Sequence, residues 1–294
     1  MLAIVGPTAS GKSEVAIRLA AATGAEIVSC DSMQVYRGFD LGTAKPSPSE
    51  RAQLRHHLID VADADELFSA ARYAAMADQA IADAQLRGRP LLIVGGTGLY
   101  LRALRFGLMD APARDEALRQ RWLVEETAQP GLLHHRLQKL DPTSAQRIEP
   151  RDLVRIVRAL EVSELTGRAL SQHHQAHVRQ ERHATRVVVL DPPMAQLEAR
   201  IAARVDKMLT SGLVEETAQL ARRFGSVRAL GAVGYREVVQ HLSGALGAHE
   251  LTSAIAMATR QYAKRQRTWF KKEPGAIFYQ SAEALYQAER PKLS

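Results

Sequence analysis

The chain is poor in cysteine and has no long apolar stretch. Cys30 is the one cysteine among 294 residues, so a disulfide within the chain is impossible and a reducing compartment is favoured. Because Cys30 lies inside an apolar run, we expect it to be a buried filler and not a nucleophile. No apolar run approaches the roughly 20 residues that span a bilayer. The first short apolar run starts at Leu2, and no charged leader is expected before it. These absences predict a cytoplasmic protein with no membrane partner.

The composition is that of an ordinary folded protein with a modest excess of positive charge. Hydrophobic residues make up 46% of the chain, enough for one large or two modest domains with proper cores. Lysine and arginine number 39 against 32 acidic residues, a formal net charge of +7. This excess is compatible with a polyanionic partner but does not establish one. Six of the ten histidines lie between residues 134 and 183, but no cysteine or carboxylate cluster accompanies them at ligand spacing, so no metal site is expected there.

A phosphate-binding loop is present near the N-terminus. Residues 6–13 read GPTASGKS, which matches G-x-x-x-x-G-K-[ST], and they stand between an apolar run at 2–5 and a helical pattern that starts at Val15. In such a loop the glycines let successive N–H groups face phosphate oxygens, Lys12 adds a positive charge and the Ser13 hydroxyl binds Mg²⁺. The pattern predicts a phosphate or diphosphate site formed by Gly6, Pro7, Thr8, Ala9, Ser10, Gly11, Lys12 and Ser13.

A carboxylate typical of ATP-hydrolysing enzymes is missing. In that class an acidic residue at the end of a later strand holds Mg²⁺, but the strand expected at 91–94 runs into the sequence GGTG at 95–98. ATP hydrolysis is therefore disfavoured. The strand expected at 26–30 does end in an acid, Asp31, at the carboxyl edge of a parallel sheet, where open α/β sheets bind ligands. Three roles stay open for Asp31: a metal ligand, a base or the cap of a turn.

The order of the expected elements predicts an α/β fold with an inserted helical domain. Strand and helix patterns alternate through about residue 108, and a strand at 186–190 followed by a helix at 197–209 resumes the alternation. The residues between these segments show no convincing strand. We expect a P-loop core with a parallel sheet, similar to nucleotide kinases, at 1–110 and 184–294, and an all-helical insertion domain at 111–183.

Two basic stripes are candidate RNA-binding surfaces. After Pro150, in what we expect to be the first turn of a helix, Arg151, Arg155 and Arg158 recur at helical spacing on one face, with apolar residues on the other. Near the C-terminus four more cations recur in this way opposite three aromatic residues and form a candidate rail for phosphates: Arg260, Lys264, Arg267 and Lys271. Each stripe is also consistent with an ordinary solvated helix face.

Six segments, taken in order, resemble the tRNA dimethylallyltransferases, also called tRNA isopentenyltransferases. They are GPTASGKS at 6–13, CDSMQVYRGFDLGTAKP at 30–46, GGTGLYLRAL at 95–104, DLVRIVRALEV at 152–162, VGYRE at 233–237 and RQYAKRQRTWF at 260–270. The likeness covers over nine tenths of the chain. Membership implies transfer of a dimethylallyl group from dimethylallyl diphosphate to the exocyclic amine of the adenosine just 3′ of the anticodon, position 37, in tRNA. The phosphate loop would then hold a diphosphate leaving group, with Mg²⁺ as cofactor.

The resemblance also assigns roles to residues. Asp31 matches the base that accepts the proton of the amine, Thr97 matches a residue that hydrogen-bonds the target base, and Lys12 would neutralise the diphosphate. The tRNA anticodon stem-loop is the implied partner, and a monomer is expected because nothing in the sequence requires self-association. Together with the basic stripes, the resemblance predicts tRNA contacts at Asp31, Ser32, Met33, Gln34, Thr97, Arg119, Arg151, Arg155, Ile156, Arg158, Gly234, Tyr235, Arg236, Arg260, Lys264 and Arg267.

Two other classes of function remain open on the sequence. A P-loop small-molecule kinase would use Lys12 and Ser13 on ATP and Asp31 as the base for a hydroxyl group, and it would have no need of the basic stripes. A non-catalytic RNA-binding module would keep the stripes but would have no use for the phosphate loop.

Overall fold

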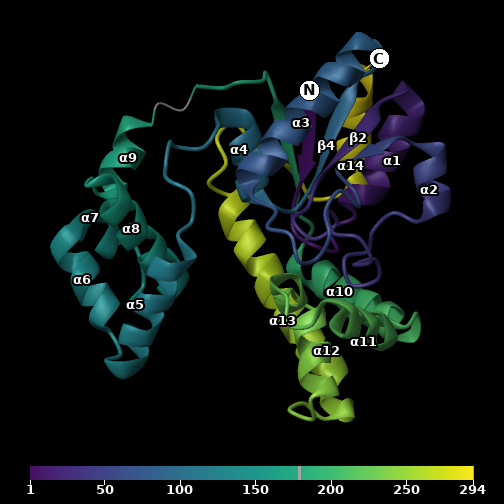
Figure 1. The fold of residues 1–294 in the computed structure, drawn as a ribbon. Helices are drawn as coiled ribbons and strands as arrows, with labels where there is room; N and C mark the ends of the chain where they lie inside the picture. Colours follow the sequence, from purple (N-terminus) through teal and green to yellow (C-terminus); the bar gives the residue numbers. More distant parts are fainter. Residues whose placement is uncertain (178–179, 294) are drawn as a thin grey trace. The chain divides into compact units, whose positions relative to one another are not determined.

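Residues 1–177 and 180–293 are described by a computed structural model. The chain divides into two compact units (Figure 1). The first, the core unit, comprises residues 1–107 and 181–294, and the second, the helical unit, comprises residues 108–180. Among the described residues, no helix is both long enough and apolar enough to span a bilayer.

The core unit is built on one parallel sheet of six strands. The strands are β1 (Leu2–Val5), β2 (Glu26–Cys30), β3 (His56–His57), β4 (Leu91–Gly95), β5 (Arg186–Leu190) and β6 (Ile277–Tyr279). Their order is β3-β2-β4-β1-β5-β6, and every neighbouring pair is parallel. The phosphate loop therefore follows a central strand, β1, and the turn after β2 lies two strands away from it. This arrangement confirms the expected α/β class.

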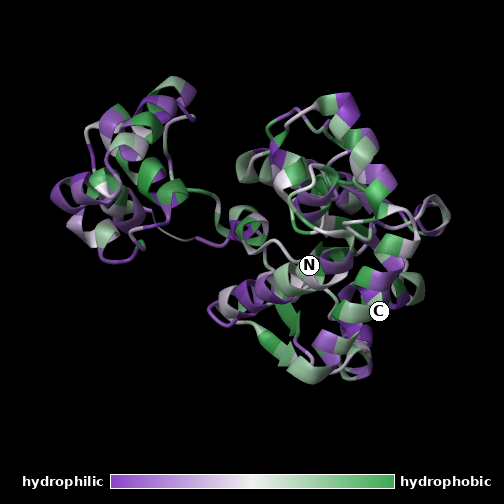
Figure 2. Ribbon diagram, turned by 90° about the horizontal axis from the view of Figure 1, so that it is seen from below, coloured by the Kyte–Doolittle hydropathy of each residue, from purple (hydrophilic) through white to green (hydrophobic). Residues whose placement is uncertain are grey.

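The sheet is covered by helices on both faces. Helices α3 (Ala70–Leu86) and α4 (Gly98–Phe106) cover one face, and α1 (Lys12–Thr23) and α14 (Ala282–Glu289) cover the other. Successive strand residues point to opposite faces, so Ala3 and Val5 of β1 belong to the first core whereas Leu2 and Ile4 belong to the second. The central strands β1 and β4 are accordingly hydrophobic, while the helices carry both hydrophilic and hydrophobic residues (Figure 2).

Four further helices pack beyond the carboxyl edge of the sheet (Figure 1). They are α10 (Met194–Thr210), α11 (Leu213–Phe224), α12 (Tyr235–Leu242) and α13 (Ala248–Phe270). Phe39, from the loop after β2, is fully buried in the core that these helices form, and Tyr36 packs against both this core and the core of the sheet. The loop after β2 is therefore held between the sheet and the helices. Shorter elements of the core unit are α2 (Pro48–Gln53) and the 3₁₀ helices η1 (Arg228–Gly231) and η2 (Arg290–Lys292).

The helical unit contains only helices and connecting segments among its described residues. The helices are α5 (Glu116–Ala128), α6 (Leu132–Leu140), α7 (Pro142–Ala145), α8 (Leu153–Thr166) and α9 (Leu170–Ala176). Trp122, Leu133, Leu137, Ile156 and Leu160 lie at the centre of its core. The unit thus has a hydrophobic core of its own.

The start of α8 differs from the sequence expectation. The helix begins at Leu153, and Asp152 caps it by accepting a hydrogen bond from the Arg155 N–H at 3.2 Å. Pro150 and Arg151 therefore precede the helix, so the expectation that they belong to its first turn and basic face is wrong. The physical reason is that an aspartate side chain satisfies a free N–H group at a helix start, which the two residues before it do not.

A buried carboxylate joins α5 to α8. The side chain of Glu161 is 0% exposed and accepts hydrogen bonds from Arg158 and, at 2.6 Å from both Nε and Nη2, from Arg119. It also accepts the N–H of Asp115, the residue that caps α5, at 2.9 Å. Burial alone would raise the pKa of Glu161, but these hydrogen bonds lower it to about 2.

We predict that Glu161→Gln destabilises the helical unit by about 3 to 5 kcal/mol near pH 7, because two arginine side chains lose their buried counter-charge. The pKa of folded Glu161 lies below the ordinary value of 4.5. Its stabilising effect is therefore complete above about pH 4.5 and is lost as the pH falls toward about 2. The difference in thermal unfolding between wild type and variant, followed by circular dichroism, should shrink between about pH 7 and about pH 3. Glu164→Gln, at an exposed site of the same helix, is the control, and a pH-independent difference for Glu161→Gln would contradict the prediction.

Candidate active site

The phosphate loop joins β1 to α1 and leaves backbone donors free. Helix α1 begins at Lys12, and its N-cap, Gly11, has a φ of 93° and supplies no side-chain cap. The first N–H groups of a helix have no partner within it, so those at the start of α1 are available to an anion. Ser13, in this first turn, is exposed. The loop therefore offers donors of the kind that phosphate oxygens accept.

Lys12 is the cation of this loop and is partly buried. Its Nζ donates a hydrogen bond to the Pro7 carbonyl at 3.1 Å. Burial lowers the pKa of Lys12 to about 8, and this shift is opposed by the nearby Asp31 carboxylate and increased by the nearby Arg204. Lys12 is therefore charged below about pH 8 and loses its charge above it.

Asp31 directly follows β2, at the carboxyl edge of the sheet. Its Oδ1 accepts the N–H groups of Met33 at 2.8 Å and of Gln34 at 3.3 Å. The residue therefore caps the turn that follows it, which is one of the three roles that the sequence leaves open. Because both bonds are made to Oδ1, the cap occupies one carboxylate oxygen and leaves Oδ2 for another donor.

Thr97, in the turn between β4 and α4, is tied to the Asp31 turn. Its N–H donates to the Cys30 carbonyl at 3.1 Å, and its Oγ1 accepts the Ser32 N–H at 3.0 Å. The two turns are therefore one hydrogen-bonded unit. Cys30 is fully buried, and burial raises the pKa of its thiol to about 12. Cys30 is thus a neutral core residue, as the sequence predicts.

The glycines on either side of Thr97 make room for side chains of α13. A Cβ atom on Gly96 would lie 2.2 Å from Nε2 of Gln266, and a Cβ atom on Gly98 would lie 2.0 Å from Nε1 of Trp269. Real Cβ atoms do not approach other atoms this closely, so a larger residue at either position would force the Gln266 or Trp269 side chain to move. The GGTG sequence therefore brings α13 against the turn.

Two arginines of α10 lie near the phosphate loop, and no sequence motif marks them. Arg200 donates a hydrogen bond to the Ser10 carbonyl at 2.7 Å. One helical turn later, Arg204 is partly buried; burial lowers its pKa, and the nearby Asp31 opposes this shift. Arg204 in turn lowers the pKa of Lys12, so the guanidinium lies close to both groups. The signal in the sequence was a pair of cations four residues apart beside the apolar stripe of α10.

Tyr262 of α13 is a third side chain at the site that no sequence motif marks. Burial raises the pKa of its hydroxyl, and the nearby Asp31 carboxylate raises it further while Thr97 opposes the shift. Tyr262 therefore stays neutral and lies close to both turns. In the sequence, helical periodicity places Tyr262 opposite the cations of the C-terminal stripe, which is typical of a core residue.

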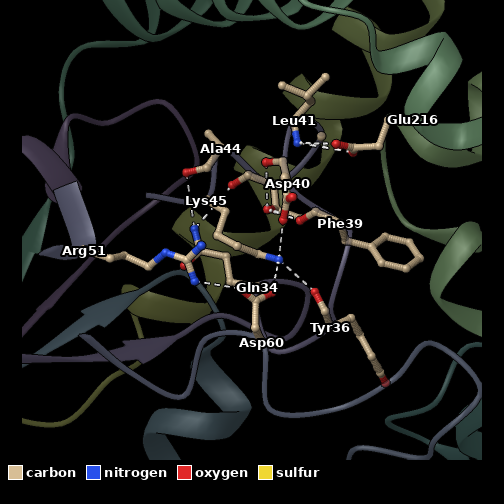
Figure 3. A network of polar contacts seen from close by, with 12 residues as sticks. Gln34, Tyr36, Phe39, Asp40, Leu41, Ala44, Lys45, Arg51, Asp60 and Glu216 are labelled. Carbon is tan, nitrogen blue, oxygen red and sulfur yellow. Dashed lines mark hydrogen bonds and ion pairs between the residues drawn. The ribbon is translucent and has the colours of Figure 1, made fainter. Parts of the chain in front are cut away.

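The loop that follows the Asp31 turn is fixed by the polar contacts of a buried lysine (Figure 3). The side chain of Lys45 is 1% exposed, and its ammonium donates to the carboxylates of Asp40 and Asp60 at 2.6 Å each and to the Tyr36 carbonyl at 2.8 Å. Burying a cation is costly unless it is paired and hydrogen-bonded, and this one has three acceptors. The Asp31 turn therefore opens a well-anchored loop.

Tyr235, which is predicted to contact tRNA, anchors the loop that follows the Asp31 turn. The Tyr235 side chain is fully buried. Its hydroxyl donates a hydrogen bond to Glu216 at 2.6 Å and accepts one from the Gly42 N–H at 3.2 Å. Glu216 also accepts the Leu41 N–H (Figure 3). A buried phenol with both hydrogen bonds satisfied belongs to the core, so the predicted tRNA contact of this residue has no support from the position of its side chain and stays a prediction. The next residue, Arg236, is 52% exposed.

Not all of the expected cations of α13 face solvent. Lys264 and Lys271 are exposed, and Arg260 is half-buried. Arg267 is 22% exposed and pairs with Asp191, the residue after β5, with 2.7 Å between Nε and Oδ1. The expectation of a face of four outward cations is therefore wrong at Arg267, because this side chain attaches α13 to the carboxyl edge of the sheet.

The expected tRNA-binding residues of the helical unit fall into two groups. Arg151 is exposed, and the side chain of Arg155 is 69% exposed. Arg119 and Arg158 are turned to Glu161, as described above, and Ile156 is fully buried. The Ile156 side chain thus belongs to the core of this unit, and its predicted tRNA contact stays a prediction. The two exposed arginines remain candidates for binding phosphates.

Comparison with known protein sequences identifies a family. Residues 34–273 match the family model described as IPP transferase. The chain is 51% identical over 278 residues to the tRNA dimethylallyltransferase of Anaeromyxobacter sp. (strain Fw109-5), and the aligned region covers 94% of this chain and 92% of the relative. It is 46% identical over 283 residues to the tRNA dimethylallyltransferase of Geobacter metallireducens, which covers 95% and 91% of the two chains.

Solved structures agree with the sequence comparison. The tRNA isopentenylpyrophosphate transferase from Bacillus halodurans is 34% identical, with a TM-score of 0.72, and the match covers 99% of this chain and 96% of the other. A eukaryotic dimethylallyltransferase acting on tRNA is 28% identical, with a TM-score of 0.81, and the match covers 98% of this chain and 75% of the other. By sequence and by fold, the chain belongs to the tRNA dimethylallyltransferases, a family of prenyltransferases.

Proposed function

We propose that the protein transfers a dimethylallyl group from dimethylallyl diphosphate to the exocyclic amine of adenosine 37 in tRNA, just 3′ of the anticodon, and releases diphosphate. The observation that supports this most is the meeting of the phosphate loop, Asp31 and Thr97 at the carboxyl ends of neighbouring parallel strands. That edge of an open α/β sheet is where ligands bind. The two substrates would meet there.

Neutralisation of charge would drive departure of the diphosphate. Negative charge builds on an allylic leaving group as its C–O bond breaks, and preorganised positive groups lower that barrier. Lys12, Arg204 and the first N–H groups of α1 provide such groups at one place. Because β4 runs into the GGTG turn and not into a carboxylate, the loop suits a diphosphate that leaves intact better than a triphosphate that is hydrolysed.

A magnesium ion fits beside this loop as an accessory to the donor. Ser13 presents an exposed hydroxyl, and the described residues contain no group of three or more His, Cys, Asp or Glu that could hold an ion. Mg²⁺ usually keeps several waters and takes oxygens from substrate phosphates, so one hydroxyl together with the diphosphate is an adequate ligand set. The ion would supply further neutralisation of the diphosphate charge.

Asp31 would act as the general base. The lone pair of an aromatic amine is delocalised, so attack on the dimethylallyl carbon is helped when the amine proton is removed as the bond forms. The new bond is N–C, the bond that breaks is the C–O bond to diphosphate, and the proton goes to Oδ2 of Asp31. The cap at Oδ1 would hold the carboxylate in place. Thr97, in the neighbouring turn, would hydrogen-bond the adenine that carries the reacting amine.

The adenosine must leave the base stack to reach this edge, at a cost of a few kcal/mol that contacts with the surrounding RNA offset. Contacts to phosphates position an RNA without reading its sequence. Exposed cations suited to the anticodon stem-loop are Lys264 on α13, Lys271 at the C-cap of α13, and Arg151 and Arg155 in the helical unit. A cytoplasmic monomer that needs no protein partner completes the proposal.

Labelled dimethylallyl diphosphate incubated with wild type and tRNA should yield label at adenosine 37, and Asp31→Asn should lower kcat by about 10² to 10⁴. An amide keeps the acceptor that caps the turn and removes only the base, so tRNA affinity should stay within about twofold. Asp65→Asn, at an exposed site, is the matched control. Mass spectrometry of digested tRNA measures the product. If wild type leaves no isoprenoid adduct the proposal fails, and full activity of Asp31→Asn removes Asp31 as the base.

The lowered pKa of Lys12 predicts how donor use depends on pH. Only the charged ammonium neutralises diphosphate, so kcat/KM for dimethylallyl diphosphate should be level below about pH 8 and fall by up to about tenfold per pH unit above it. Lys12→Arg keeps its charge throughout, and its profile should lack this fall whatever its absolute rate. Initial rates between about pH 7 and 10 give both profiles. A fall shared by Lys12→Arg would assign the pH dependence to another group.

Removing an exposed cation should weaken RNA binding without affecting chemistry. Lys264→Gln and Arg155→Gln should each reduce the slope of log K against log salt concentration by about one unit per lost phosphate contact. Arg89→Gln removes an exposed cation just before β4, at the opposite edge of the sheet, and should leave the slope unchanged. Fluorescence anisotropy of labelled tRNA at several salt concentrations measures the slopes. Slopes equal to that of wild type would exclude both residues from the interface.

A further inference from the structure

Gln266 of α13 is buried between the phosphate loop and the Thr97 turn. Its Oε1 accepts the Thr8 N–H at 2.8 Å, and its Nε2 donates to the Gly96 carbonyl at 2.9 Å. A backbone N–H only donates and a carbonyl only accepts, so the two partners fix which way the side-chain amide points. Both ends of the amide are therefore used, each on a different loop.

This amide continues the hydrogen bonding of the sheet beyond the ends of its strands. β1 and β4 are paired up to Val5 and Gly95, after which each chain enters its own loop. Between the loops, the Gln266 amide presents an acceptor to one side and a donor to the other, as a peptide group does between two strands. Gly96 permits this, since a Cβ atom there would lie 2.2 Å from Nε2.

The bridge connects the two proposed substrate sites. Thr8 belongs to the loop that would hold the diphosphate, and its N–H is engaged by Gln266, so other N–H groups of the loop are left to face the anion. On the other side Gly96 precedes Thr97, whose Oγ1 accepts the N–H of the residue after Asp31. Hydrogen bonds, the peptide bonds of Gly96–Thr97 and Asp31–Ser32, and the Thr97 side chain therefore connect the leaving-group site to the proposed base.

We propose that Gln266 is a positioning residue for prenyl transfer, which holds the phosphate loop and the Thr97 turn at a fixed separation and thereby sets the distance between the donor carbon and the acceptor amine. The proposal rests on the function proposed above. Reaction between two bound groups depends steeply on their placement, and a displacement of about 1 Å can cost on the order of 10²-fold in rate. Gln266 acts through Thr8 and Gly96 and touches neither reacting group.

Gln266→Met removes both hydrogen bonds and fills nearly the same volume. We expect kcat to fall by at least about tenfold, while KM for dimethylallyl diphosphate and KM for tRNA each change by less than about threefold. Gln79→Met makes the same change at an exposed site of α3 and should keep the kcat of wild type. An unchanged kcat in Gln266→Met, with or without a lower melting temperature, would overturn the positioning role and leave the amide a merely structural one.

Gln266→Glu separates the two hydrogen bonds and guards against a folding defect. A charged carboxylate accepts the Thr8 N–H but repels the Gly96 carbonyl, whereas the neutral acid accepts from one and donates to the other, as the amide does. Burial favours the neutral acid at higher pH than in water. The ratio of the kcat of Gln266→Glu to that of wild type should therefore rise reversibly by about tenfold between about pH 8 and pH 6. A ratio that does not change with pH would overturn the proposal.

Amide hydrogen exchange at Thr8 tests the bridge without turnover. Exchange should be slow in wild type and in Gln266→Glu, which both keep an acceptor for this N–H, and at least about tenfold faster in Gln266→Met. Equal exchange in all three proteins would overturn the proposal whether or not tRNA is modified. Failure of wild type to modify tRNA, with this pattern of exchange intact, would instead count against the proposed function.

Discussion

Hydrogen bonds between loops at the carboxyl edge of the sheet are the interaction on which the site depends. The parallel strands deliver the phosphate loop, the Asp31 turn and the Thr97 turn to one edge, but strand pairing ends at Gly95. Beyond that point Thr97 and Gln266 join the loops to one another. An unpaired buried backbone group costs about 1 to 3 kcal/mol, so each loop is strongly biased toward the arrangement in which these bonds are made.

The features that the sequence predicts well are those that depend on near neighbours in the chain. Apolar alternation marks the strands, and GPTASGKS marks the turn into α1, because both reflect contacts within a few residues. Asp31 is found in the same way, as the residue after a strand. Gln266 is not, because its partner Thr8 is 258 residues away. Neither is the pairing of Arg267 with Asp191 across 76 residues, since a periodic pattern carries no information about distant partners.

Sequence periodicity has a second limit. Helical spacing tells which residues lie on one face, but it does not tell whether that face meets solvent, a carboxylate or another helix. Tyr235 and Ile156 lie in segments that resemble RNA-binding motifs, yet their side chains are fully buried. Arg119 and Arg158 are cations in sequence, but they share a buried Glu161. Such segments combine residues that support the surface with residues that form it, and only the packing separates the two kinds.

Lys12 lies near a second cation, Arg204, and burial disfavours the charged form of both. A diphosphate beside them would offset both penalties, so Lys12 would hold its proton more tightly with the donor bound than without it. Above about pH 8, Lys12 would therefore take up a proton from the medium when the donor binds. It would release this proton when the diphosphate product leaves. The measured heat of donor capture would then vary with the ionisation enthalpy of the buffer, and the apparent affinity would be coupled to proton concentration through a single amine.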